Sequence, residues 1–277
     1  MRAPMRPRRI VLVMGAFYVL GMRATSRTSF PARFKIIHVL GDSGDDERCI
    51  ADVDPRHACS AKEWKRGAMS DPYGANIYTE PASVDKNTLA NLGPLTGIAG
   101  VWEGRRGLDV NPKEAGPERQ VFIERIELQP IDPQTNGPQL FYGLRYHTHI
   151  VKPGEVETYH DQVGYWLWEP ATGNLIQTLT IPRGQTAMAF GRAAKDDRRF
   201  ELIATRGSVT NGICSNPFLE EAFRTDEYRI RVTIDANDSW SYEEETTLLV
   251  RGQPFHHTDR SVFKRIAPPT PNPLAAR

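Results

Sequence analysis

Five histidines in the C-terminal two thirds of the chain are the side chains best suited to hold a metal or a cofactor. They are His147, His149, His160, His256 and His257. A neutral imidazole binds transition metals through either ring nitrogen. The sequence contains no catalytic acid–base pair, nucleophile elbow, phosphate loop or dinucleotide fingerprint. The five histidines are therefore the candidates for metal or cofactor chemistry, and each also has a structural alternative.

His147 and His149 lie two residues apart in a predicted strand, so they share one face with Arg145. Two imidazoles at this spacing can converge on one ion, and His160 could complete a mononuclear metal site. The alternative is a polar strand face in contact with water, with Leu144 and Tyr146 on the buried side.

The other histidines also have structural alternatives. His160 lies in YHDQVGYWLWEP, where its ring could simply satisfy a turn carbonyl. His256 and His257 precede the last predicted strand, and neighbours on an extended chain point to opposite faces, so only one of them is expected to face the interior. Glu243, Glu244 and Glu245 predict a charged outer strand face, with an inward-facing member as the alternative.

Short β-rich segments separated by turn residues follow Gly100, which is typical of an all-β barrel or sandwich. Ten strands are predicted: 101–110, 120–129, 139–151, 158–168, 174–181, 186–191, 200–205, 228–235, 239–250 and 258–266. An open sheet of this size would leave two bare edges, and closure removes them. We therefore expect one closed antiparallel barrel with a cavity for a small ligand.

Two short helices are expected besides the strands. One covers Asn87–Leu95 and ends at Gly93-Pro94, and the other has Asn216 as its N-cap and Pro217 at its first position. Cys214 lies next to the second helix without a basic neighbour, so we interpret it as a packing residue.

Composition limits the classes of partner. A net charge of +1 gives no reason to expect nucleic acid or an anionic membrane surface. Cys49, Cys59 and Cys214 form neither a zinc motif nor a disulfide framework. The expected partner is a small molecule in the barrel, with no stable membrane insertion and with a homodimer as an open possibility.

Three regions are expected along the chain: a poorly structured extension at 1–68, the barrel at 69–266 and a flexible proline-rich tail at 267–277. Residues 1–25 join arginines to a short apolar run, as an export signal does. Because Met69 opens a second natural-looking start, we favour a misassigned start codon and a cytoplasmic protein. Export is the alternative.

Five short motifs, in order, resemble the nitrobindin family, which comprises haem-binding barrels similar to fatty-acid-binding proteins. They are GVWEG at 100–104, YHDQVGY at 159–165, IPRG at 181–184, DEYRI at 226–230 and WSYEEETTLLVRGQPF at 240–255. The resemblance runs from Leu92 to Arg265. Within it, the sequence is similar to that of an uncharacterised bacterial branch of the family.

The resemblance implies a ten-stranded barrel with haem b near its mouth, held by one histidine close to the last strand. The family is associated with ferric haem that binds nitric oxide and isomerises peroxynitrite to nitrate. It also implies His257 as the proximal ligand, with His256 as an alternative, and His160, Trp102 and Gly104 around the cofactor.

The match departs from the family at one important position. In a gapless alignment on Gly252-Gln253-Pro254, the family's iron-binding histidine falls on Thr258, one residue beyond His257. Either a one-residue shift in the loop brings His257 to the iron-binding position, or this branch no longer binds haem and uses the barrel for another ligand. A non-catalytic carrier of a lipid or small apolar molecule, with Trp102, Trp166 and Trp168 in its wall, is thus a second hypothesis. The metal site at His147, His149 and His160 is a third.

Overall fold

The computed structural model describes residues 72–235 and 238–277. The predicted extension at 1–68 therefore lies outside the described residues. The signal-like segment 1–25, Cys49 and Cys59 lie outside them as well.

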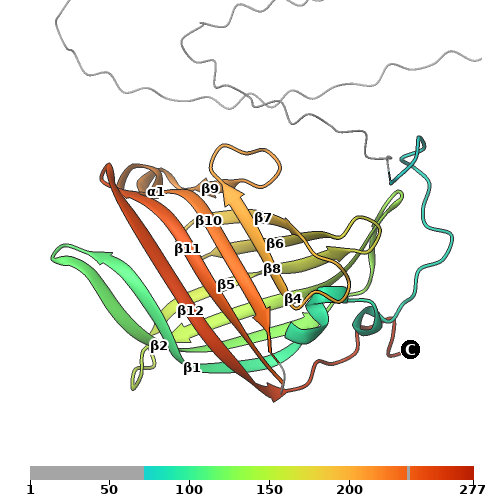
Figure 1. Ribbon diagram of the computed structural model, residues 1–277, viewed down its shortest axis with the longest axis horizontal. Coiled ribbons are helices and arrows are strands. Elements are labelled where there is room, and N and C mark those ends of the chain that lie inside the picture. The colour runs from blue at the N-terminus through green and yellow to red at the C-terminus, as the bar shows by residue number, and fades with distance from the viewer. Residues whose placement is uncertain (1–71, 236–237) are drawn as a thin grey trace, which may run out of the picture. The chain divides into compact units, whose positions relative to one another are not determined.

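Ten long strands in the described part of the chain form a closed antiparallel barrel (Figure 1), as predicted. Their order is β2-β1-β12-β11-β10-β8-β7-β6-β5-β4, and pairing between β2 and β4 closes the ring. The strands are β1 (Gly100–Lys113), β2 (Gly116–Pro130), β4 (Gln139–Val151), β5 (Thr158–Glu169), β6 (Asn174–Ile181), β7 (Gln185–Arg192), β8 (Arg199–Thr205), β10 (Phe223–Ile234), β11 (Ser239–Val250) and β12 (Gln253–Ala267). Short strands β3 (Gln134–Asn136) and β9 (Ile213–Ser215) pair with β4 and β7.

The last strand, β12, begins five residues earlier than predicted. Arg251 has φ 47° and Gly252 has φ 81°, so both central residues of the β11–β12 turn are left-handed. This geometry is that of the tight turns that hold hairpin strands in register, and Val250 pairs directly with Gln253. His256 and His257 therefore lie within the strand and not before it.

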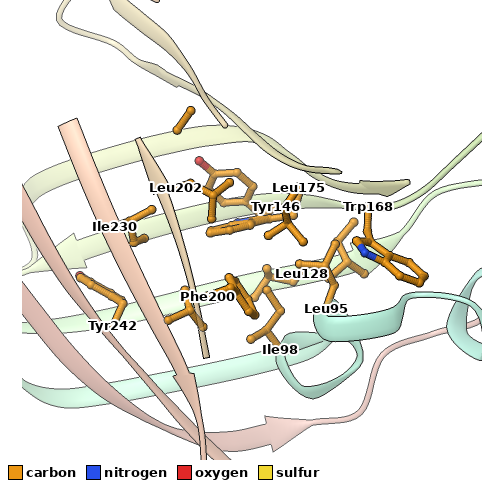
Figure 2. Packing of buried hydrophobic residues seen from close by; sticks show 14 of the residues in the cluster. Leu95, Ile98, Leu128, Tyr146, Trp168, Leu175, Phe200, Leu202, Ile230 and Tyr242 are labelled. Atoms are coloured by element: carbon orange, nitrogen blue, oxygen red, sulfur yellow. The ribbon is translucent and has the colours of Figure 1, made fainter. Parts of the chain in front are cut away.

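One end of the barrel is plugged by two short 3-10 helices, where the sequence predicted a single helix over Asn87–Leu95. They are η2 (Thr88–Ala90) and η3 (Gly93–Ile98). Gly93 has φ 55°, which separates the two. Leu95 and Ile98 are fully buried and lie beside Leu128 and Phe200 in the apolar cluster (Figure 2).

The proline-rich tail was expected to fray, but its residues are anchored next to this plug. Asn272 is fully buried, and its Oδ1 accepts a hydrogen bond from the backbone N–H of Thr88 at 3.1 Å. Its Nδ2 donates to the carbonyl oxygen of Lys86 and to the carboxylate of Asp132, both at 2.8 Å. These bonds tie the tail to the segment that enters the barrel.

The opposite end of the barrel carries the short helix α1 (Pro217–Ala222) (Figure 1). Asn216 caps it as predicted, because its side chain accepts a hydrogen bond from the N–H of Leu219 at 3.1 Å. Cys214 in β9 is exposed and unpaired by a disulfide, so the predicted packing role does not hold for it. Among the described helices, none has the length and apolar content needed to cross a membrane.

Candidate ligand cavity

A cavity of about 540 Å³ lies inside the barrel, on the side away from the η3 plug. This volume falls in the range that holds small molecules and cofactors. Its wall is largely apolar and aromatic, with Phe122, Ile126, Ile150, Trp166, Leu179, Ile230, Trp240 and Leu248 among its members. At the end that carries α1, Lys113, Arg183 and Phe218 line it. The barrel therefore holds a partly apolar compartment with basic groups at the end that carries α1.

His257 points into this cavity from β12. Its Nε2 lies 2.8 Å from Oδ1 of Asp109 on the neighbouring strand β1 and 3.2 Å from Oδ2 of Asp259. The two contacts fix the orientation of the ring and leave Nδ1 as the nitrogen available to a ligand. Burial alone lowers the pKa of His257, but the hydrogen bond to Asp109 and the charge of Asp259 outweigh it and raise the pKa above its ordinary value.

A second layer of polar groups holds Asp109. Its other oxygen, Oδ2, accepts hydrogen bonds from the hydroxyl of Tyr159 and, at 2.7 Å, from Nδ2 of Asn111. Burial raises the pKa of the Asp109 carboxyl, yet the hydrogen bonds from His257, Tyr159 and Asn111 outweigh burial and the net shift is downward. Asp109 is therefore an ionised partner that stays beside the imidazole.

His160 lines the same cavity from β5. Its Nε2 lies 3.3 Å from Oε1 of Gln162. Burial, followed by the charge of Arg183, lowers the pKa of His160, so its ring is neutral at neutral pH. A neutral imidazole can donate a hydrogen bond to a molecule in the cavity or accept one from it.

Three inward-facing carboxyl groups occupy directly opposed positions on three adjacent strands. Asp109 of β1 pairs with Asp259 of β12, and Asp259 pairs with Glu244 of β11. We call this set the carboxyl row. Like charges in opposed positions destabilise a sheet. Burial, more than any other cause, raises the pKa of Asp259 well above its ordinary value. The row is therefore stable when some of its members carry protons or face a cation.

Two further features of the inner wall are acids hydrogen-bonded to tyrosines, of which Glu124 is fully buried and Glu244 is half-buried. Glu124 accepts a hydrogen bond from the hydroxyl of Tyr242 at 3.0 Å, and Glu244 lies 3.1 Å from the hydroxyl of Tyr228. Burial raises the pKa of each carboxyl to about 8. Both acids are thus largely protonated at neutral pH.

The structure places His147 and His149 on the outer face of β4, with Arg145, as the strand pattern predicted. His147 contacts Asp161 at 2.9 Å, and His149 contacts Thr158 at 3.1 Å. His160 faces the cavity instead, so the three imidazoles do not come together. In the described part of the chain, the group of three ligand-type side chains that does converge is Asp109, His257 and Asp259.

The remaining predicted site residues lie away from the cavity wall. His256 is on the outer face of β12, where it approaches Glu245 at 3.9 Å, and Thr258 alternates to the same face. Trp102 is fully buried and donates a hydrogen bond from Nε1 to the carbonyl oxygen of Ile98 at 2.7 Å. At Gly104, an added Cβ would lie 2.3 Å from Oγ of Ser261, so this position serves close strand packing.

Sequence reasoning missed Asp109, Asp259, Glu124 and Tyr159. Strand alternation carries the signal for Asp259, because it shares a face with His257 once both belong to one strand. No local signal identifies Asp109, since its partner lies 148 positions away in the chain.

A closed barrel with an accessible cavity and an oriented imidazole on its wall is a small-molecule-binding β-barrel. The model of the family described as "THAP4-like, heme-binding beta-barrel domain" matches residues 91–265, and the chain belongs to this family, the nitrobindin family. The structure is similar to the crystal structure of Rv2717c from M. tuberculosis, with 23% identity, a TM-score of 0.46 and coverage of 64% of this chain and 96% of that one. No curated protein matches the sequence.

Proposed function

We propose that the cavity binds haem and that His257 is the iron ligand. The observation that carries the proposal is the position of His257, which presents an imidazole to the cavity of a chain from a heme-binding barrel family. Metal-binding histidines commonly give their second ring nitrogen to a carboxylate, which orients the ring. Asp109 supplies such a partner at 2.8 Å.

The other lining residues also suit haem. Trp166, Leu179 and Ile150 offer apolar surface to a porphyrin, while Arg183 and Lys113 offer charges of the sign that its two carboxylates need. His160, a neutral hydrogen-bonding group in the cavity, would be available to a ligand of the iron. We infer haem b, since a single histidine suffices to hold it without a covalent link to the chain.

When bound, a ferric haem would supply one open coordination position able to accept nitric oxide or peroxynitrite. We propose these as ligands, with isomerisation of peroxynitrite to nitrate as the reaction. The chain's own residues would have two roles. Asp109 would orient the ring of His257, and neutral His160 would offer a hydrogen bond to peroxynitrite.

Carriage of a fatty acid is less well supported. A fatty-acid carboxylate in the inner cavity would meet Glu124 and Glu244, two acids without a basic partner among the described residues. A fatty acid would therefore have to place its carboxylate at the other end of the cavity, beside Arg183 and Lys113.

The test is a haemin titration of the full chain followed by its absorption spectrum. His257→Ala should abolish the Soret shift, whereas His256→Ala, which alters the adjacent outward-facing imidazole, should preserve it. A Soret shift that survives His257→Ala, or that is lost equally in both variants, would contradict the assignment.

A further inference from the structure

A second polar site lies deeper in the cavity, around Glu244. The hydroxyl of Tyr228 lies 3.0 Å from Oε1 of Gln177 and 3.1 Å from Oε2 of Glu244. A phenol has one hydrogen to donate, and both of these oxygens are acceptors when the acid is ionised. Tyr228 can donate to only one of them. Without a ligand, all three groups therefore have hydrogen-bond partners when Tyr228 donates to Gln177 and a protonated Glu244 donates to Tyr228.

No basic side chain compensates Glu244 within residues 72–235 and 238–277. The acids that face it are Tyr228 from β10, Asp259 from β12, Asp109 from β1, Glu124 from β2, Tyr146 from β4 and Tyr242 from its own strand. The base beside this group is His257, two residues from Asp259 on the same face of β12, and its ion pairs are with Asp109 and Asp259. By contrast, its neighbour Glu245 on the outer face pairs with Arg231 at 2.7 Å.

Glu244 lines a cavity whose wall also carries aromatic rings. Trp166, Tyr146 and Trp240 line the same cavity, and the rings of Tyr146 and Trp166 lie 6.4 Å apart. Aromatic faces attract organic cations, more strongly where water is excluded.

We propose that the inner end of the cavity binds a small organic ammonium ion, with Glu244 as its counter-ion and the rings of Tyr146 and Trp166 against its apolar body. The ammonium group donates to the Glu244 carboxylate, and the proton held by the empty site is released to solvent. Tyr228 then keeps its hydrogen bond to Gln177. The positive charge also reduces the electrostatic repulsion between Glu244 and Asp259, which lie opposite each other in the carboxyl row. Because Trp166 also lines the part of the cavity proposed for haem, the site is tested in the haem-free chain.

The test uses benzylamine as the probe and benzyl alcohol as its neutral analogue of similar size. Calorimetric titration of the full chain at pH 7, in two buffers with different ionisation enthalpies, measures affinity and proton release together. We expect benzylamine to bind about tenfold or more tightly than the alcohol, with release of close to one proton. Glu244→Gln should remove both effects, and the matched control Glu245→Gln should retain them.

A second measurement does not depend on the folding of a variant. Between pH 6 and pH 8 the affinity of the unmodified chain for benzylamine should rise, because fewer protons compete for Glu244. Equal affinity for the amine and the alcohol, or an affinity that is flat with pH, would overturn the proposal. Proton release by Mn²⁺ alone, with no binding of benzylamine, would make the site a metal site and would also overturn it. Neither result bears on the Soret test of His257.

Discussion

His257 and Asp109 meet across the seam of the barrel, with 2.8 Å between Nε2 and Oδ1. The seam joins β1 to β12, strands from the two ends of the barrel sequence. The contact thus couples barrel closure to the geometry of the candidate ligand site, because the imidazole has its orientation only when these strands are paired.

Removal of the charge of Asp109 should weaken haem binding. Asp109→Asn replaces the acceptor of the His257 N–H by an amide, and loss of such outer partners typically costs about 10- to 100-fold in metal affinity. Haemin titration measures the effect. Asp161→Asn, which alters the analogous partner of His147 on the outer face, is the control and should bind haemin as the unmodified chain does. Equal losses in the two variants would argue against the role of Asp109.

Folding stability should fall as pH rises from about 5 to 8. The folded-state pKa values of Glu124 and Glu244 are raised to about 8 by burial, from a usual value of 4.5. Over this window the folded state holds more protons than the unfolded chain, so stability is fully present at the acidic side and is lost as these carboxyls ionise. Each group contributes a slope of about 1.4 kcal/mol per pH unit.

Urea unfolding at several pH values measures this slope. Glu124→Gln should make the profile flatter, because it removes one titrating group while keeping an acceptor for Tyr242. Glu245→Gln should not flatten it, since ion pairing with Arg231 lowers the pKa of Glu245. A profile that rises over the window would be inconsistent with buried neutral acids.

Asn272→Ala should destabilise the barrel by about 2–3 kcal/mol, because it leaves the backbone N–H of Thr88 and the carbonyl oxygen of Lys86 without their partner. Thermal unfolding is the measurement. Thr270→Ala removes an exposed hydrogen bond to Gln129 in the same tail and should change stability by less than about 0.5 kcal/mol. Similar melting temperatures for both variants would show that the tail contributes nothing to the fold.

Gly104→Ala should cost about 1–3 kcal/mol through overpacking against Ser261. A double-mutant cycle with Ser261→Gly should show favourable coupling, because the second change removes the nearest atom. Additive effects would mean that the adjacent atoms of Val262 and Phe263, at 3.2 and 3.3 Å, determine the cost instead.

Most of the barrel could be predicted from the sequence because its turns are encoded locally. The bounds of β4, β6 and β11 agree with those expected, and alternation correctly placed His147 and His149 beside Arg145. The start of β12 was missed for a physical reason. Its turn places an arginine, Arg251, in the left-handed region, where sequence patterns lead one to expect glycine or asparagine.

The wrong start of β12 also prevented most of the candidate site from being predicted. A strand that starts at Thr258 leaves the facing of His257 undecided, whereas a strand that starts at Gln253 puts His257 and Asp259 on the inner face together. An inward-facing member of the run Glu243–Glu245 was expected only as an alternative to an outer face, and the structure shows that this member is Glu244. Its pairing with Asp259 depends on the register between strands, which composition does not specify.

Pairing between β1 and β12 also bears on how the protein can be made. During synthesis β1 (Gly100–Lys113) emerges first among the barrel strands, and one of its edges stays unpaired until β12 (Gln253–Ala267) has left the ribosome. An unpaired edge is a template for wrong association, and ring closure between such distant segments is slow. The nascent barrel is therefore most in need of protection by chaperones until its last strand is in place.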